Sequence, residues 1–219
     1  MLKPAWGHLG WGVRVLRRDR DRFIEVGGTG ERLTAEDVLA IMVRDPHWPA
    51  WIVQERIRNH PDLQRLAASE AVQTVRAITL LRRDGHVELL WADLRVVMGE
   101  AQVDNWRDGS TGNGLAPVDL GSGRIGPVVA PAPGGEGTVV HEVHPRSGIR
   151  FDEVVLPGWP DAVRLLERVA PELAPLRAVG WDVVLAGDGP LILEIQARWG
   201  PHNQSRAMPA ITAAMEAEV

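Results

Sequence analysis

Residues 180–196 read GWDVVLAGDGPLILEIQ, two apolar runs joined by a glycine-rich turn. Such runs on either side of a turn predict a β-hairpin. If the turn is centred on Asp188, the residue numbers of each opposed pair add up to 376. Asp182 then lies opposite Glu194, Gly180 opposite Gln196 and Val184 opposite Ile192. Since side chains alternate along a strand, Asp182, Glu194 and Gln196 are expected on one face of the hairpin and the apolar residues on the other.

This face has the composition of a metal site. Opposed side chains in a hairpin lie about 5 Å apart at Cβ, where two carboxylates repel each other unless a cation lies between them. Mg²⁺ prefers oxygen ligands of this kind. We therefore predict that Asp182, Glu194 and Gln196 bind Mg²⁺, or Mn²⁺ in its place. The alternative is that the two acids form the solvated face of an edge hairpin. The polar loop that follows, Arg198 to Asn203, favours the metal site.

A second pattern lies near the N-terminus, where Gly7, Gly10 and Gly12 occur within six residues. A strand is expected after them, whereas Walker and dinucleotide-binding loops are both followed by a helix. Glycines still allow backbone N–H groups to approach phosphate oxygens, and Lys3 would add a positive charge. The alternative is an ordinary turn. The acids downstream favour a phosphate-covering loop.

Composition excludes several classes of protein. The chain has 219 residues, of which 45% are hydrophobic, so it can bury a core. Its net charge of −5 argues against nucleic acid or an anionic membrane as the main partner. No apolar run approaches the roughly 20 residues of a membrane helix. The absence of cysteine rules out thiolate metal sites and agrees with a cytoplasmic location.

The order of patterns predicts an α+β protein with two lobes. Residues 1–50 read as a hairpin followed by a helix, which begins at the capping box Thr34-Ala35-Glu36-Asp37. Residues 51–219 read as a larger, mainly antiparallel sheet with helices over Pro61 to Ala68 and Asp161 to Val169. The sequences of the loops Asp108 to Gly114 and Pro131 to Gly137 do not indicate which ligand they would recognise.

Taken together, these segments resemble the ATP-grasp superfamily in their order and spacing. The likeness is carried by Leu2-Lys3-Pro4 with its glycines, Val53-Gln54-Glu55, Gly180-Trp181-Asp182 and Leu193-Glu194-Ile195-Gln196. Four further segments resemble the branch called sugar-transfer-associated ATP-grasp, so that the likeness covers nearly the whole chain: Asn59-His60-Pro61-Asp62-Leu63, Thr74-Val75-Arg76, Val103-Asp104-Asn105 and His144-Pro145-x-x-Gly148.

The resemblance implies that ATP binds in a cleft between two lobes. Lys3 would contact the α and β phosphates, and Gly7 to Gly12 would cover the phosphates. Gln54 to Ile57 would form an interlobe strand near adenine and ribose, with Glu55 contacting a hydroxyl and Gln54 and Ile57 beside the nucleotide. Asp182, Glu194 and Gln196 would hold Mg²⁺. The family usually has Asn at the position of Gln196, which keeps the amide oxygen on a chain one methylene longer. The family also has an upstream region with a second phosphate-contacting lysine, and we expect such a region before Met1.

The resemblance further implies that a carboxylate is phosphorylated by ATP and that an amine then displaces the phosphate, with small-molecule acids and amines as partners. The protein's part in such chemistry is positioning and charge neutralisation. Arg76 and Arg95 lie within β-runs, where an arginine needs an anionic partner. We expect Arg76 to meet phosphate or the substrate carboxylate, and structural ion pairing is the alternative for both arginines. Two other functions remain open: phosphoryl transfer to a hydroxyl, and a truncated or degenerate module that binds nucleotide without catalysis.

Overall fold

The computed structural model describes residues 1–6, 11–26, 28–101, 104–106, 109–133, 136–200 and 208–217. The chain divides into two compact units, Met1–Ile57 and Arg58–Val219. The sequence prediction placed this division after residue 50. The units divide later because Trp51–Val53 pairs with Leu2–Pro4 in the first unit. Within the described residues, every helix is too short or too polar to cross a bilayer.

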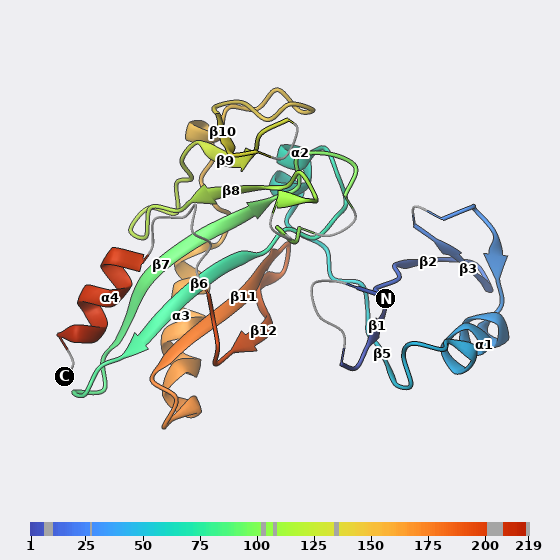
Figure 1. Ribbon diagram of the computed structural model, residues 1–219, viewed down its shortest axis with the longest axis horizontal. Helices are drawn as coiled ribbons and strands as arrows, with labels where there is room; N and C mark the ends of the chain where they lie inside the picture. Colours follow the sequence, from blue (N-terminus) through green and yellow to red (C-terminus); the bar gives the residue numbers. More distant parts are fainter. Residues whose placement is uncertain are drawn as a thin grey trace. The chain divides into compact units, whose positions relative to one another are not determined.

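In the residues that the structure describes, the first unit contains two small antiparallel sheets and one helix (Figure 1). One sheet consists of β1 (Leu2–Pro4) and β5 (Trp51–Val53), and the other of β2 (Leu16–Asp19), β3 (Arg22–Glu25) and β4 (Arg32–Leu33). The strand expected over Gln54 to Ile57 is wrong, because β5 ends at Val53 and these four residues form no strand. The β2–β3 hairpin turns tightly at Arg20, which has a φ of 58°.

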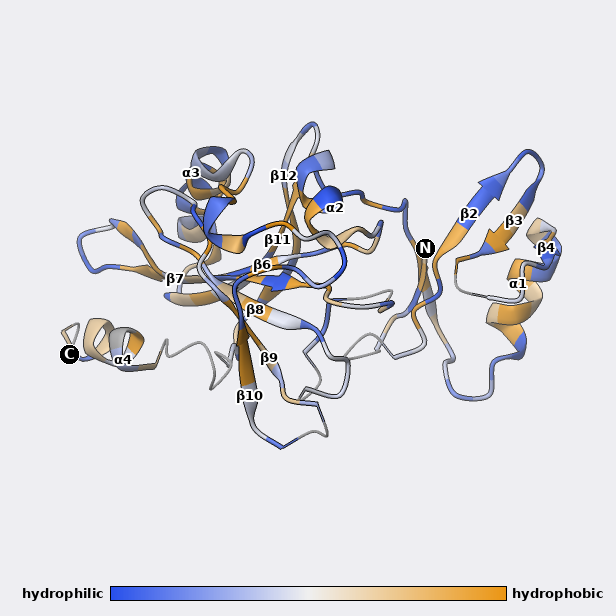
Figure 2. Ribbon diagram, turned by 90° about the horizontal axis from the view of Figure 1, so that it is seen from above, coloured by the Kyte–Doolittle hydropathy of each residue, from blue (hydrophilic) through white to orange (hydrophobic). Residues whose placement is uncertain are grey.

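Helix α1 (Ala35–Arg44) begins at the predicted capping box. The Thr34 hydroxyl accepts the Asp37 backbone N–H at 3.0 Å, and the Asp37 carboxylate accepts the Thr34 N–H at 2.8 Å. These two bonds satisfy donors that a helix start leaves unpaired. None of the residues of α1 is buried, and Leu39 and Val43 are largely exposed. In Figure 2, much of α1 has the orange colour of hydrophobic residues.

The second unit is built on one seven-stranded antiparallel sheet, in the order β10-β9-β8-β7-β6-β11-β12. Its strands are β6 (Val75–Leu81), β7 (Val87–Val96), β8 (Gly114–Pro117), β9 (Val128–Pro131), β10 (Thr138–His141), β11 (Ala178–Ala186) and β12 (Gly189–Gln196). The helices are α2 (Pro61–Ala67), α3 (Trp159–Val169) and α4 (Met208–Glu216), with short 3₁₀ turns at Phe151–Glu153 and Ala170–Leu173. The predicted α+β class with mainly antiparallel sheets is confirmed.

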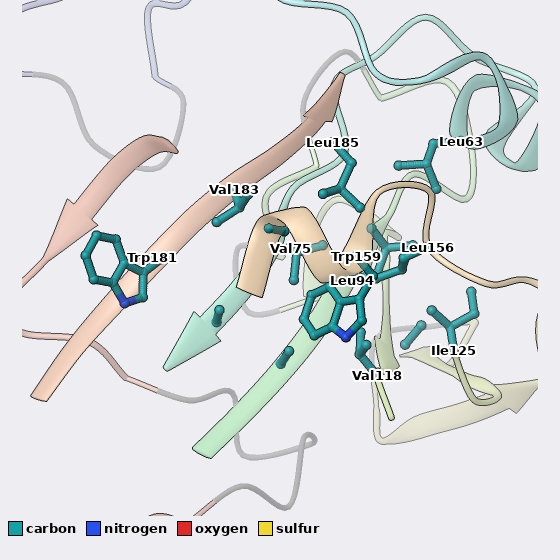
Figure 3. Close-up of a cluster of buried hydrophobic side chains, with 14 of the residues drawn as sticks. Leu63, Val75, Leu94, Val118, Ile125, Leu156, Trp159, Trp181, Val183 and Leu185 are labelled. Atoms are coloured by element: carbon teal, nitrogen blue, oxygen red, sulfur yellow. The ribbon is translucent and has the colours of Figure 1, made fainter. Parts of the chain in front are cut away.

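The two faces of this sheet differ. One face carries Val75, Leu94 and Val183 and packs against Trp159 and other residues of α3 and its neighbours to form the main core (Figure 3). The other face carries Ile78 and Leu80, which form a smaller cluster with Ile211 of α4. Helices α3 and α4 therefore lie on opposite sides of the sheet (Figure 2). The α4 face also bears the charged residues of the candidate site.

The hairpin of β11 and β12 confirms part of the predicted register. Asp182 pairs with Glu194 and Gly180 with Gln196, as expected. Beyond Asp182 the register shifts by one, so Ile192 pairs with Val183 and not with Val184. The turn is the two-residue Gly187-Asp188, a length that suits the twist of a hairpin. A β-bulge at Leu193 absorbs the extra residue and keeps Glu194 opposite Asp182.

Candidate active site

A row of charged residues crosses four adjacent strands on one face of the large sheet. Asp93 of β7 pairs with Arg76 of β6, Arg76 with Asp182 of β11, and Asp182 with Glu194 of β12. Because paired residues of neighbouring strands point to the same face, all four side chains share the α4 face. Gln196 and Arg95 lie two residues from Glu194 and Asp93 and belong to the same face.

Asp182 is held by two arginines from neighbouring strands. It is 4% exposed, and Arg76 and Arg95 are similarly buried. Arg76 donates from Nε to Oδ1 at 2.7 Å and from Nη2 to Oδ2 at 3.3 Å, while Arg95 donates from Nη1 to Oδ2 at 3.2 Å. Both carboxylate oxygens of Asp182 are thus occupied. The structural pairing that the sequence left as an alternative is what the structure shows for both arginines.

Two more buried acids lie near these arginines. Asp104 accepts the backbone N–H and the hydroxyl of Thr74 at 2.7 and 2.5 Å. Asp93 is 2% exposed, and its Oδ1 has no hydrogen-bond partner among the described residues. Burial raises the pKa of Asp93 to about 7 and also raises the pKa of Asp104. Neither acid was predicted as a site residue. The alternation of the β7 run could have placed Asp93 on the face of Arg95.

The other two predicted metal ligands are more accessible. Glu194 is exposed and Gln196 is half-buried. The Gln196 amide nitrogen lies 3.5 Å from Asp182 Oδ2, a long contact that leaves the amide oxygen available. Beside them, Trp199 packs so closely on Gly180 that a Cβ there would lie 2.4 Å from the Trp199 Cβ. The glycine lets an aromatic side chain lie against the sheet next to the acids.

The donor types fit Mg²⁺, although the present arrangement is not a finished metal site. Two carboxylates and an amide supply hard oxygen ligands from adjacent positions of one hairpin. Among the described residues, however, no three acidic or histidine side chains converge as ligands. Asp182 would have to give up arginine contacts to bind a cation. The chemistry of the donors therefore fits, and the pairing of Asp182 must change.

The predicted nucleotide contacts belong to the first unit. Lys3 is half-buried and lies on β1 opposite Ile52. Gly12 has a φ of +73°, and a Cβ there would lie 2.7 Å from both Pro4 and Trp48, so its glycine is also required by packing. Gly7 and Gly10 lie outside the described residues, as do His202 and Asn203.

The segment after β5 contributes the remaining predicted contacts. The Gln54 backbone N–H donates to the Met1 carbonyl at 2.9 Å, and the Met1 amino group donates to the Gln54 carbonyl at 2.8 Å. The Gln54 amide oxygen is buried without a partner in the described chain. Glu55 is exposed and Ile57 is half-buried. An orphaned buried amide oxygen next to an exposed acid is consistent with the predicted contacts to a ligand.

A family model described as sugar-transfer associated ATP-grasp matches residues 1–208. The chain belongs to this family. No curated protein and no solved structure gives a significant match. Membership of an ATP-grasp family indicates ATP-dependent, ligase-type chemistry and the ability to bind a nucleotide. ATP-grasp proteins generally use ATP together with Mg²⁺.

A cavity of about 520 Å³ is lined in part by residues of the two loops whose sequences do not indicate a ligand. It is bounded by Gly109, Ser110, Gly112, Pro131, Pro133, Ala130, Ala132, Val139, His141, Met98 and Pro145. Val129 pairs with Leu115 and Leu115 with Arg95, so Val129 shares the sheet face of the charged row. Ala130 is the next residue after Val129 on β9, and Val139 and His141 flank Val140, the partner of Val129 on β10. Ala130, Val139 and His141 therefore lie on the sheet face opposite the charged row, so the cavity does not adjoin Asp182.

Two histidines in turns have structural roles. His144 is buried, its Nδ1 accepts the backbone N–H groups of Arg146 and Ser147, and its Nε2 lies 2.9 Å from the Val97 carbonyl. Nε2 must therefore carry the proton, because Nδ1 acts as an acceptor. His60 caps the start of α2 by accepting the Asp62 backbone N–H at 3.2 Å. Both side chains stabilise turns.

Proposed function

We propose that this ATP-grasp chain binds Mg-ATP and phosphorylates a small-molecule carboxylate, which an amine then attacks to form a C–N bond. The observation that carries the proposal is the row on the α4 face of the large sheet. It brings Asp182, Glu194 and Gln196 together beside two arginines. Oxygen ligands next to guanidinium groups suit a metal–triphosphate complex.

The proposed roles follow from charge and position. Asp182, Glu194 and Gln196 would hold Mg²⁺, which neutralises phosphate charge when bound. Arg76 and Arg95 would provide donors for the transferred phosphoryl group or the substrate carboxylate. In the first unit, Lys3 would contact the α and β phosphates and the segment from Gly7 to Gly12 would cover them. Gln54, Glu55 and Ile57 would lie beside adenine and ribose.

The residues would promote the reaction by placing and neutralising charges. Attack of a carboxylate oxygen on the γ-phosphorus forms one O–P bond and breaks the bond to the β-phosphate oxygen, releasing ADP. The amine nitrogen then forms a bond with the acyl carbon, the bond from that carbon to the phosphate oxygen breaks, and the proton that nitrogen loses goes to the departing phosphate or to solvent. The first step brings two anions together and the second expels a phosphate anion, so cationic side chains fixed on strands lower both barriers by their position.

One observation favours a second candidate, a module that binds nucleotide without catalysis. Both oxygens of Asp182 are taken by arginines, which a metal would have to displace. A third candidate, phosphoryl transfer to a hydroxyl, is distinguished by its products. Ligation yields ADP, phosphate and a new amide bond only when an amine is present, whereas a kinase yields ADP and a phosphate ester.

Calorimetry tests the metal assignment directly. We expect wild type to bind ATP more tightly with Mg²⁺ than without it, and Glu194→Ala to lose most of that difference. Asp188→Ala is the matched control, since Asp188 is an exposed acid in the turn of the same hairpin. Equal Mg²⁺ dependence in wild type and Glu194→Ala would refute the site.

A further inference from the structure

Asp93 is a buried acid next to an arginine that is bound to a different acid. Arg76 lies between Asp93 on β7 and Asp182 on β11, in register with both. Its Nε and Nη2 donate to Asp182, whereas Asp93 Oδ1 has no partner among the described residues. Since register neighbours lie about 5 Å apart, both acids are within reach of one guanidinium. Arg76 therefore has two acceptors and uses one.

The charges of the buried cluster support this interpretation. It contains two arginines, Arg76 and Arg95, and three acids, Asp93, Asp104 and Asp182. Full ionisation would leave one uncompensated negative charge, which is costly in a buried position, and one bound proton restores neutrality. Asp182 accepts hydrogen bonds from both arginines, and Asp104 Oδ2 accepts two from Thr74. Asp93 has an oxygen without a hydrogen-bond partner among the described residues, so it is the natural site of the proton.

We propose that Asp93 is a positioning residue that takes over Arg76 when a divalent cation binds Asp182, releasing its proton to solvent as it does so. The inference rests on the metal site of the proposed function. A cation and a guanidinium group repel each other across one carboxylate, so occupation of Asp182 drives Arg76 toward its other neighbour. The O–H bond of Asp93 breaks, the proton goes to water or buffer, and an ion pair replaces it.

The exchange leaves Arg76 able to act on a ligand. A guanidinium group has five N–H donors, and a carboxylate engages two of them. Donors therefore remain for phosphate or a substrate carboxylate while Asp93 fixes the orientation. Arg95 reaches the cluster from the same strand as Asp93, and Asp104 from the loop that follows it; neither is in register with Arg76. Pro117, opposite Asp93 on β8, adds no charge.

Proton release measured by calorimetry tests the inference. Mg-ATP is titrated into the full chain at pH 7 in buffers of low and high ionisation enthalpy, such as PIPES and imidazole, and the enthalpy difference gives the number of protons released. The pKa of about 7 means that Asp93 carries about half a proton at pH 7. Wild type should release about half a proton more than Asp93→Asn, and this excess should decrease at pH 8.

Asp93→Asn should also bind Mg-ATP about tenfold more weakly, because a neutral hydrogen bond replaces a charge-assisted one. Asp188→Asn is the control, the same substitution of an exposed acid outside the cluster, and it should keep the excess proton release. Equal release from wild type and Asp93→Asn, or an equal loss of the excess in Asp93→Asn and Asp188→Asn, overturns the inference while the proposed function stands. A wild-type chain that does not bind Mg-ATP refutes both.

A measurement on wild type guards against a variant that does not fold. The ¹³C resonance of the Asp93 carboxyl group should show the protonated acid at pH 6 without ligand and the ionised form after addition of Mg-ATP. A resonance that still shows the protonated acid in the complex contradicts the transfer of Arg76 from Asp182 to Asp93. A resonance that is already ionised at pH 6 without ligand contradicts it as well, since no proton would be left to release.

Discussion

Replacing Asp182 with alanine removes an acceptor that two buried guanidinium groups share. Asp182 is 4% exposed and receives three hydrogen bonds from arginines, two from Arg76 and one from Arg95. Although a buried ion pair adds little net stability compared with an apolar pair, removing one partner leaves a buried charge uncompensated and costs about 3–5 kcal/mol. Asp93 can offset part of this by ionising, so we expect the lower end, about 3 kcal/mol.

Urea denaturation of the full chain checks this magnitude. With a slope of about 2 kcal/mol per molar urea, a loss of about 3 kcal/mol lowers the midpoint by about 1.5 M. Hydrogen exchange of the β6 and β11 amides assigns the change to the second unit. The control is Glu142→Ala, which removes an exposed pair with Arg150 and should cost less than about 1 kcal/mol. If Asp182→Ala costs no more than this control, the arginines do not depend on Asp182.

Two further predictions concern the turn and the sheet around the site. Burial lowers the pKa of His144 from its ordinary 6.5, so the neutral ring stabilises the fold above about pH 6.5 and this contribution is lost as the pH falls. The melting temperature of wild type should therefore drop more than that of His144→Gln between pH 7.5 and 5.5. Equal drops would exclude His144 as the cause. Gly180→Ala places a methyl group 2.4 Å from the Trp199 Cβ, so it should displace Trp199 and cost about 1–3 kcal/mol in urea denaturation. Gly187→Ala, with no atom within 4 Å of the added group, should change stability far less, and an equal loss would mean that Trp199 does not pack on Gly180.

Local patterns in the sequence predicted the parts of the fold that local interactions determine. The capping box at Thr34 and the pairing of Asp182 with Glu194 are both confirmed. The bulge at Leu193 leaves no such signal, because an apolar residue inside an apolar run looks the same whether it is paired or extra. The sequence therefore predicted a single register up to the turn, with Val184 opposite Ile192, whereas in the structure Val183 pairs with Ile192.

The chemistry of the site was harder to predict because it depends on distant partners. The sequence identified Arg76 and Arg95 as arginines that need anions, but 106 residues separate Arg76 from Asp182. Only the strand order, which places β6 between β7 and β11, brings them together. The burial of Asp93 follows from the same order. Strand β10 was not predicted, because its four residues show no strict alternation of apolar and polar side chains.

The position of the bulge at Leu193 bears on how this hairpin could change in evolution. The extra residue lies between the Gly187-Asp188 turn and the paired acids, so a deletion there would restore regular pairing on both sides without moving Glu194 away from Asp182. Insertions and deletions near the tip can thus be absorbed before they reach the acids. Homologues that differ in the length of this tip can be expected to keep the same two acids face to face.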